Sequence, residues 1–453
     1  MKKILVAGAG HGGLSAAAIL SKNGFDVTVI EKETIESIGH DWHDAMDIPA
    51  FKFADIPVPD ESDFRRGLNM CYYNPKKTAR INMDGGPGVS SSSCITIDRK
   101  FLIRHLIKHC ESCGVSFIFG TEIISAICEG TRVTGIRTAS ADGEREFFAD
   151  MIIDAAGMHS PVRRSLPEEF DIERDFSEDE TFEIFRAYYE NTEKYITSPN
   201  YSVFFYNCGK PGLDWVITEE DYIDVLIGKF GSLSEEEIEA SLKDIRENYP
   251  GIGLTPVRGG GTAKIPLAKT VSRLVADSYA LIGDSASMTV PLNGSGIDLS
   301  LQAGKLLATV IAASSENGFR KEDLWQYQYR YFTLFGNSLI AIAVLRRFLS
   351  AVTAEDIDFF LEKGILSEKE IGMAGGDFSA VNAKYVIEKL IAAAPEIKLL
   401  PHLAKSARNL PLIPLAEKIM PPVWDKKRSE NGLSFTVSYK YILILILEFI
   451  IIV

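Results

Sequence analysis

The chain has 453 residues, of which 46% are hydrophobic and 24% are charged, and its formal net charge is −14 at pH 7. A chain of this length predicts two or three domains, and its acidic balance disfavours nucleic acid, whose phosphates attract clustered lysine and arginine. Its six cysteines form no disulfide framework, which favours a reducing compartment such as the cytoplasm.

The N-terminal segment predicts a βαβ unit. Residues 3–7 (KILVA) predict a buried strand, residues 13–23 a helix that ends at Gly24, and residues 26–31 (DVTVIE) a second strand. This order of elements begins a parallel sheet with helical crossovers.

The next part of the chain is predicted from its composition and its strand signals. Residues 40–94 are rich in glycine, proline, aspartate and serine, and they predict an irregular connection. Residues 99–113 predict a helix, and residues 115–153 alternate strand signals with turns, which indicates a β-meander. Residues 151–155 (MIIDA) predict another buried strand.

The sequence changes character after the meander. Acidic clusters surround strand-like pieces at 201–207 and 222–229, so a second, β-rich domain is expected over residues 166–254. Residues 279–283 (YALIG) return to a buried strand, and a helix is expected near 297–312.

The C-terminal part is predicted to be a helical region over residues 321–430, followed by an apolar tail over 431–453. The last stretch, 441–453, contains Glu448 and is shorter than the about 20 residues that a spanning helix needs. Its β-branched bias favours an edge strand, with peripheral membrane contact as the alternative.

A glycine pattern, Gly8-x-Gly10-x-x-Gly13, joins the first strand to the first helix. Gly8 permits a tight turn, Gly10 lets a pyrophosphate approach the backbone, and Gly13 lets helix and strand pack closely. Glu31 follows roughly 20 residues later, where an acid binds ribose hydroxyls and disfavours a 2′-phosphate. The pattern predicts a dinucleotide site without separating NAD from FAD.

Two later segments resemble the flavin hydroxylase and geranylgeranyl reductase superfamily of FAD-dependent oxidoreductases. Residues 154–163 (DAAGMHSPVR) resemble its DGxxSxVR segment, with Ala156 where the family often has Asp. Residues 281–296 (LIGDSASMTVPLNGSG) resemble its second flavin signature. In these two segments the resemblance implies that the FAD-binding residues are Asp154, Gly157, Gly283, Asp284, Pro291, Gly294 and Gly296.

Two of these assignments carry a chemical expectation, and a further residue, Arg99, matches the family outside these segments. The family's carboxylate at the position of Asp284 binds the ribityl chain, and its loop up to Gly296 places amides near the flavin ring. The helix that follows would help to stabilise negative charge on a reduced flavin there. Arg99 matches an arginine that commonly contacts FAD.

Within the superfamily the sequence is most similar to the geranylgeranyl reductases. Residues 259–267 (GGGTAKIPL) resemble their GG-x-IP stretch. Residues 213–217 (LDWVI) lie where they carry Y-x-W-x-F-P, and this chain keeps Trp215 but lacks the proline. Residues 37–50 contain no cysteine, so the role of the cysteine that archaeal reductases often have there is not transferred.

Four side chains are candidates for the catalytic or substrate site. His40 or His43 could donate a proton, because both lie in the loop that the family places near the flavin. Tyr206 and Trp215 could line a flat or isoprenoid pocket, and core packing explains them equally well. His105, His109 and Cys113 share a helix face but lack a further ligand cluster, so no metal is predicted.

These observations predict an α/β fold with a Rossmann-like FAD-binding domain, containing a parallel sheet and a β-meander, at 1–165 and 255–320. A β-rich substrate domain is inserted at 166–254, and the helical C-terminal region follows. The resemblance implies reduction of C=C bonds in an apolar, prenyl-type or lipid-like substrate by hydride transfer from flavin N5. The reductant would be NAD(P)H or a protein electron donor. The alternatives are an FAD-dependent monooxygenase using NAD(P)H and O₂, and a non-catalytic flavoprotein electron carrier.

Overall fold

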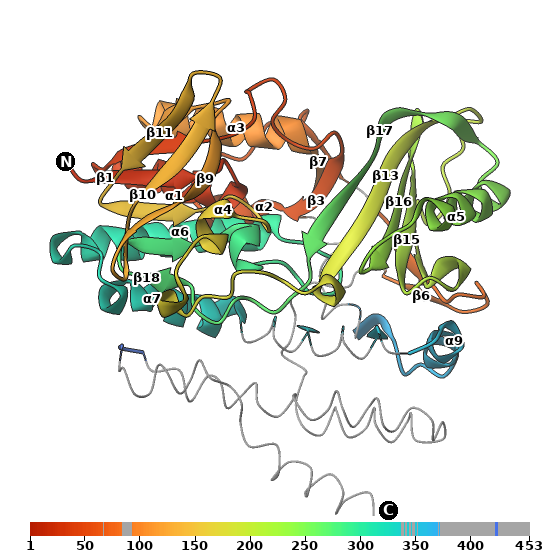
Figure 1. Cartoon of the computed structure of the whole chain (residues 1–453). Helices are drawn as coiled ribbons and strands as arrows, with labels where there is room; N and C mark the ends of the chain where they lie inside the picture. The colour runs from red at the N-terminus through yellow and green to blue at the C-terminus, as the bar shows by residue number, and fades with distance from the viewer. Residues whose placement is uncertain are drawn as a thin grey trace, which may run out of the picture.

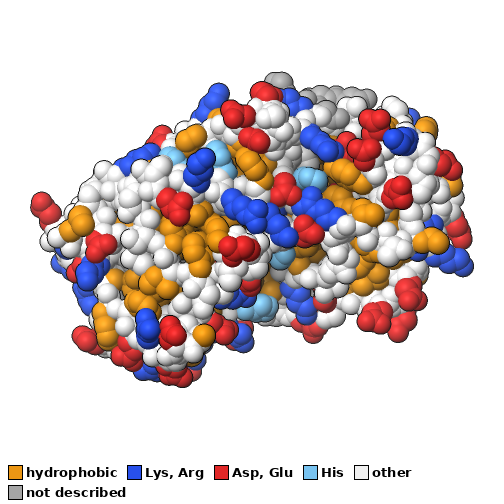
Figure 2. Space-filling view, turned by 90° about the horizontal axis from the view of Figure 1, so that it is seen from above, with side chains coloured by type: hydrophobic (Ala, Val, Ile, Leu, Met, Phe, Trp, Pro, Cys, Tyr) orange, Lys and Arg blue, Asp and Glu red, His pale blue; other side chains and the backbone are white. Residues whose placement is uncertain are grey.

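The computed structural model describes residues 1–66, 68–83, 93–336, 352–369 and 422–424, and the positions 339, 342–343, 346, 349–350 and 371. Two large β-sheets dominate this part of the chain and lie at opposite ends of the molecule in Figure 1. On the face shown in Figure 2, acidic and basic side chains are interspersed with apolar patches.

The first sheet has six strands in the order β18-β19-β12-β1-β2-β8. All neighbours run parallel except β18 and β19, which pair antiparallel. Its inner strands are mostly apolar because helices and a three-stranded β-meander cover its faces. The strands are β1 (Lys3–Ala7), β2 (Asp26–Ile30), β8 (Ser116–Ile118), β12 (Met151–Asp154), β18 (Val275–Ala276) and β19 (Tyr279–Leu281).

Helices and a β-meander complete this half of the molecule. Helix α1 packs against both α3 and α6, α6 packs against α7, and the meander contacts β12 through β10. The helices are α1 (His11–Lys22), α3 (Arg99–Ser112), α4 (Pro161–Arg164), α6 (Ile297–Ser314) and α7 (Lys321–Tyr331). The meander strands are β9 (Glu122–Glu129), β10 (Arg132–Ser140) and β11 (Gly143–Phe148). The predicted βαβ unit, meander and helix at 99–113 are confirmed.

Helices α1 and α6 cross closely because glycines line their contact. A Cβ on Gly304 would lie 2.5 Å from the Ser15 Cβ and 2.7 Å from the Gly12 carbonyl oxygen. Among the described residues, the segment Ile297–Asn317 is long and apolar enough to cross a membrane. Its packing against α1 and α7 accounts for that apolar character.

The second sheet has seven strands in the order β17-β13-β16-β15-β14-β5-β6, antiparallel apart from β14 and β5. Helix α5 (Glu235–Asn248) begins with a capping box between Ser234 and Glu237 and packs its apolar side with residues of this sheet. The strands are β5 (Met70–Tyr73), β6 (Arg80–Asn82), β13 (Thr181–Asn191), β14 (Tyr201–Phe205), β15 (Gly212–Thr218), β16 (Tyr222–Phe230) and β17 (Ile252–Pro266). The predicted insertion at 166–254 thus supplies β13 to β16 and α5, and the sheet takes further strands from both sides of it.

The irregular connection predicted for residues 40–94 is wrong in part. In its described residues this segment forms β3 (His43–Asp47), α2 (Ile48–Phe53), β4 (Phe64–Arg65), β5 and β6, and it ends where β7 (Cys94–Asp98) begins. Strand β7 pairs with β3 and β4, and β5 pairs with β14. These strands are too short to show a period, and they form because distant partners supply their hydrogen bonds.

The C-terminal region is described in part. After α7 the chain makes a π-helical turn (Phe332–Gly336), and α9 (Ala354–Glu362) begins with the N-cap Thr353. Most of the predicted helical region beyond residue 371 and the whole tail at 431–453 lie outside the described residues.

Candidate functional site

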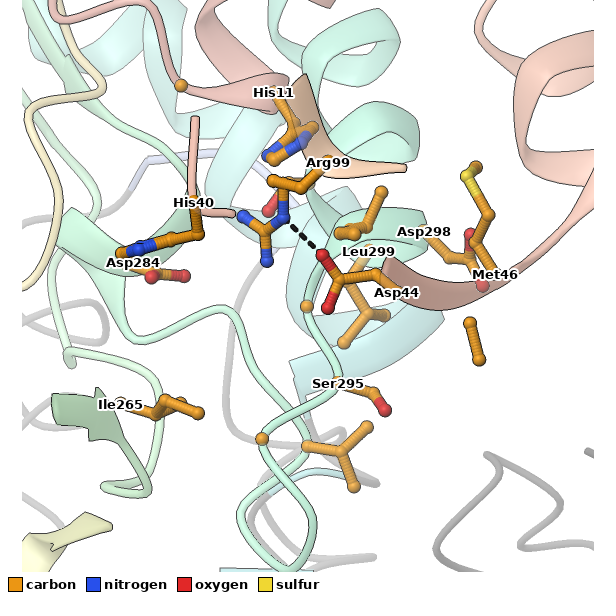
Figure 3. Close-up of a pocket in the computed structure, with 18 of the residues that line it drawn as sticks. His11, His40, Asp44, Met46, Arg99, Ile265, Asp284, Ser295, Asp298 and Leu299 are labelled. Atoms are coloured by element: carbon orange, nitrogen blue, oxygen red, sulfur yellow. Dashed lines mark hydrogen bonds and ion pairs between the residues drawn. The ribbon is translucent and has the colours of Figure 1, made fainter. Parts of the chain in front are cut away.

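A cavity of about 1290 Å³ lies between the two sheets. One end is lined by the glycine turn after β1, and the other by the face of the seven-stranded sheet that is turned away from α5. Figure 3 shows the middle of this cavity, where residues from α1, β3, α3 and the start of α6 face one another. Segments far apart in sequence therefore form one continuous space.

The glycine turn has the geometry that its spacing predicted. Gly8 has φ +89°, and a Cβ there would lie 2.7 Å from the Ala155 carbonyl oxygen. A Cβ on Gly13 would lie 2.6 Å from the Ala155 Cβ, and Gly10 is the N-cap of α1. Glu31 accepts hydrogen bonds from the backbone N–H of Ala9 (2.7 Å) and of Glu33 (2.9 Å). The acid thus braces the turn as well as lining the cavity.

Asp284 presents an open carboxylate to the cavity. It follows Gly283 (φ +68°) in a short 3-10 turn, and its carboxylate has no hydrogen-bond partner among the described residues. Water reaches it by way of the cavity while protein surrounds it. The cavity walls desolvate the carboxylate and raise the pKa of Asp284, and the Arg99 charge acts in the opposite direction. A ligand hydroxyl would supply the missing partner.

The loop before α6 also borders the cavity. Gly294 has φ +75°, and a Cβ added there would lie 3.0 Å from the Ile265 side chain. Gly296 is the N-cap of α6. Both line the cavity, whereas Pro291 is buried beside it and is not part of the wall. The first turn of α6 therefore directs backbone N–H groups toward this space.

Asp154 has a different position from the one that the resemblance implied. Its carboxylate is fully buried and accepts hydrogen bonds from the Ser160 hydroxyl (2.5 Å) and the Tyr279 hydroxyl (2.7 Å). It therefore holds the 154–163 turn to β19 and does not line the cavity, while Gly157 (φ +83°) does. At Asp154, the resemblance of residues 154–163 to the DGxxSxVR segment corresponds to the conformation of this turn.

A chain of charged side chains crosses the cavity wall. The Arg99 guanidinium donates to the carboxylate of Asp44, as the dashed line in Figure 3 shows. Asp44 also lies 3.8 Å from Arg186, and Asp224 accepts two hydrogen bonds from Arg186 at 3.0 and 2.6 Å. Sequence reasoning missed Arg186 and Asp224, because nothing near them in the chain distinguishes them from surface charges of a strand.

The histidines of the cavity are neutral at physiological pH. Burial, with a smaller contribution from Arg99, lowers the pKa of His11 to about 3. Burial also lowers the pKa of His40, which stacks on Trp42, and of His43, which stacks on Tyr222. An unprotonated imidazole is a weak acid, so the predicted role of His40 or His43 as proton donor loses support. The Nε2 of His11 is buried without a hydrogen-bond partner among the described residues.

The two predicted aromatic candidates are separated by the fold. Trp215 lines the cavity, with its ring 5.3 Å from the Arg186 guanidinium and 5.8 Å from the Tyr201 ring. Tyr206 is buried outside the cavity wall, and its hydroxyl donates to the carbonyl of Leu349. Trp215 therefore remains a candidate for substrate contact, and Tyr206 holds the C-terminal region to the sheet.

The sheet end of the cavity is apolar. Alternate residues of each strand point into it, because successive side chains of a strand face opposite sides of a sheet. The residues of this wall are Met70, Tyr72, Ile184, Tyr201, Val203, Leu213, Trp215, Ile217 and Leu226. This wall suits a long apolar ligand, and the ion pair of Arg186 and Asp224 lies beside it on the same sheet face.

A second acid borders the cavity at the start of α6. Asp298 accepts from the backbone N–H of Asp47, at 3.3 and 3.2 Å from its two oxygens. Burial and the Asp47 carboxylate raise the pKa of Asp298 to about 7. The thiol of Cys94 lies in the same wall, and burial raises its pKa to about 12. No sequence motif had pointed to Asp298.

The three side chains that resemble metal ligands, His105 and His109 on α3 and Cys113 just after it, do not meet at one point. His105 Nε2 lies 2.7 Å from the carbonyl of Pro57, while His109 Nε2 lies 3.8 Å from the Cys113 sulfur. Among the described residues, no three His, Cys, Asp or Glu side chains form a group that could hold a metal ion.

Known proteins resemble this chain in both sequence and fold. The FAD binding domain family matches residues 62–330, and an NAD(P)-binding Rossmann-like domain family matches residues 6–47, which contain the glycine turn. A digeranylgeranylglycerophospholipid reductase of Sulfolobus acidocaldarius is 21% identical over 81% of this chain and 82% of its own length. Another from Methanothrix thermoacetophila is 24% identical over 87% of this chain and 97% of its own.

The crystal structure of a geranylgeranyl bacteriochlorophyll reductase-like protein from Thermoplasma acidophilum has the same fold. It superposes with a TM-score of 0.71 at 19% identity, over 90% of this chain and 99% of its own. The matched FAD binding domain covers more than half of the chain, and the cavity supplies the glycine turn and open acid that such a cofactor needs. The chain therefore belongs to the FAD binding domain family, as an FAD-dependent oxidoreductase of the geranylgeranyl reductase-like type.

Proposed function

We propose that this protein reduces carbon–carbon double bonds of an apolar, prenyl-type lipid and uses FAD held in the cavity between its two sheets. The observation that carries the proposal is the continuity of that cavity. It joins the glycine turn, where a dinucleotide binds, to an apolar sheet face that would hold a hydrocarbon chain.

The residues at the glycine end fit the diphosphate and sugar parts of FAD. The N-terminus of α1 directs N–H groups and a partial positive charge toward a diphosphate. The open Asp284 carboxylate would accept from ribityl hydroxyls, and Arg99 would add a cation beside the phosphates. His11 offers its neutral imidazole, whose Nε2 has no protein partner among the described residues. Glu31 would accept from the ribose, with part of its carboxylate already used by the turn.

The bound FAD supplies a hydride once NAD(P)H or a protein donor has reduced it. The described residues contain one glycine fingerprint of this kind, and the NAD(P)-binding match at residues 6–47 ends before the FAD binding match at 62–330 begins. We therefore expect the reductant to bind transiently at the cavity mouth, without a second dinucleotide domain.

The sheet end determines which molecules enter. Its wall places Val203 opposite Trp215 and Tyr201 opposite Ile217 on adjacent strands, and burying a prenyl chain there gains roughly 25 cal/mol per Å² of apolar surface. Arg186 lies at the edge of this wall and is neutralised by Asp224 and Asp44, so it adds no net attraction for anions. The relatives named as digeranylgeranylglycerophospholipid reductases have a substrate of this apolar class in their names.

The test uses the FAD-loaded protein. It is reduced by light under anaerobic conditions and mixed with a geranylgeranyl lipid in detergent, while flavin absorbance and lipid mass are followed. We expect reoxidation of the flavin together with lipid that gains two hydrogens per double bond. Reoxidation by oxygen with a hydroxylated product would support the monooxygenase alternative. Flavin binding with neither activity would support the electron carrier.

A matched pair of variants separates substrate binding from cofactor binding. Val203→Trp fills the apolar wall and is expected to abolish reoxidation by the lipid, while FAD affinity is unchanged because the wall lies at the far end of the cavity. Phe148→Trp, at an exposed position of the meander, is the control for a bulky substitution. Equal reoxidation in all three proteins would contradict the proposed substrate site.

A further inference from the structure

The proposed reduction requires a proton source, because a double bond takes up one hydride and one proton. The cavity histidines are poor sources, since burial lowers the pKa of His11, His40 and His43 and leaves them unprotonated. Asp44 is also excluded, because Arg99 and Arg186 outweigh its burial and hold its pKa low. Asp298 is a further acid in the same wall, and burial and a neighbouring carboxylate favour its protonated form.

Asp298 has the position for this role. It is the second residue of α6 and lines the cavity beside Met46, on the opposite side of Arg99 from His40 and Asp284 (Figure 3). Its only hydrogen-bond donor among the described residues is the backbone N–H of Asp47. Within that part of the chain, no Lys, Arg or His side chain contacts its carboxylate.

The groups packed against Asp298 favour its protonated form. Burial and the carboxylate of Asp47 on β3 raise the pKa of Asp298, and the hydrogen bond from the Asp47 backbone N–H acts in the opposite direction. Lys305, the next lysine along α6, pairs with Asp55 at 2.6 Å instead. The dipole of α6 favours the carboxylate at its N-terminus and opposes this effect. The pKa of about 7 that results lets the group both hold and release a proton near neutral pH.

We propose that Asp298 is the proton donor of the cavity, an inference that rests on the proposed reduction. One carbon of the double bond receives the hydride, with its two electrons, from reduced FAD. The neighbouring carbon takes the proton of Asp298: the O–H bond of the acid breaks, a C–H bond forms and the π bond is lost. The carboxylate left behind regains its proton from solvent that enters the cavity.

The first experiment detects the proton without any substrate. Infrared spectra of the FAD-loaded protein are recorded from about pH 5 to 9, and the carboxylic C=O stretch is followed. We expect a band that disappears near pH 7 in the wild type and in Asp55→Asn, a control acid that contacts the same helix outside the cavity wall. The band should be missing in Asp298→Asn. If Asp298→Asn keeps the band, the inference is overturned.

The second experiment measures transfer. Photoreduced protein is mixed with geranylgeranyl lipid in buffered D₂O, and the rate of flavin reoxidation and the deuterium content of the product are measured. We expect the wild-type rate to fall as the pH rises through about 7. Asp298→Asn should react roughly 100-fold more slowly and lose this pH dependence. Its FAD dissociation constant should be unchanged.

The outcomes separate the two proposals. A wild-type rate and pH profile in Asp298→Asn would overturn the role of Asp298 while leaving the reductase function standing. A wild-type protein that no geranylgeranyl lipid reoxidises would overturn the reductase function and the proton transfer together. In that case the infrared titration still decides whether Asp298 holds a proton at neutral pH.

Discussion

The carboxylate of Asp44 on β3 accepts a hydrogen bond from the guanidinium of Arg99, the first residue of α3. The same carboxylate lies 3.8 Å from Arg186 on β13. One acid thus connects the cofactor end of the cavity to the seven-stranded sheet. Because the two cations outweigh burial, the pKa of Asp44 stays below its usual value.

Asp44→Asn should destabilise the protein and weaken FAD binding. Removing one partner from a buried ion network leaves a cation uncompensated and costs about 3 kcal/mol. A free Arg99 would also lose its fixed orientation toward the cavity. Thermal unfolding and FAD titration measure the two effects. Asp41→Asn, at a carboxylate that is 49% exposed, is the control and should change the unfolding temperature little. Equal stability of the two variants would contradict the network's role.

Asp284→Ala should weaken FAD binding without weakening the fold. The Asp284 carboxylate lies open to the cavity and has no protein hydrogen-bond partner among the described residues, so its removal breaks no contact of the fold. Loss of a charged hydrogen bond to the cofactor should raise the FAD dissociation constant by roughly 10- to 100-fold. Calorimetry of the FAD-free protein and fluorescence titration with FAD give both values. A lower unfolding temperature without FAD would assign Asp284 a structural role instead.

Gly13→Ala should disrupt the glycine turn. A Cβ there would lie 2.6 Å from the Ala155 Cβ and 2.8 Å from the Val6 side chain, so helix and strand must separate. Overpacking of this kind costs about 1–3 kcal/mol, and it should also lower FAD affinity. Gly261→Ala is the matched control, because a Cβ at that position meets no atom within 4 Å. Unfolding temperatures and FAD content of the purified variants decide the outcome.

Asp298 should make the protein less stable as the pH rises toward neutrality. Its pKa is raised from 3.8 to about 7 in the fold, so between these values the folded chain holds a proton that the unfolded chain has lost. The stability that this proton gives is present at low pH and is lost as the pH rises through about 7. Denaturant unfolding from about pH 4 to 8 should show a smaller decline for Asp298→Asn than for the wild type. Parallel curves for the two proteins would contradict the raised pKa.

The sequence by itself determined the cofactor half of the molecule. Gly8, Gly10 and Gly13 lie within six residues of the chain, and their roles depend on local backbone geometry, so spacing alone predicts the turn and the parallel strands around it. The same holds for the loop from Gly283 to Gly296, whose short-range pattern matched a known signature. Residues whose roles depend on their neighbours in sequence can be predicted from a local sequence motif.

Tertiary structure decided the rest of the cavity. Asp298 gained its proton affinity from burial and from Asp47, and Arg186 gained its partners Asp44 and Asp224, across distances of many residues in the chain. The short strands between residues 43 and 98 likewise exist because β14 and one another supply their hydrogen bonds. Burial and charge pairing depend on which surfaces meet, and a local pattern contains no information about its distant partner. For the same reason the sequence could not show that Asp154 and Tyr206 lie outside the cavity wall and that Trp215 lies in it.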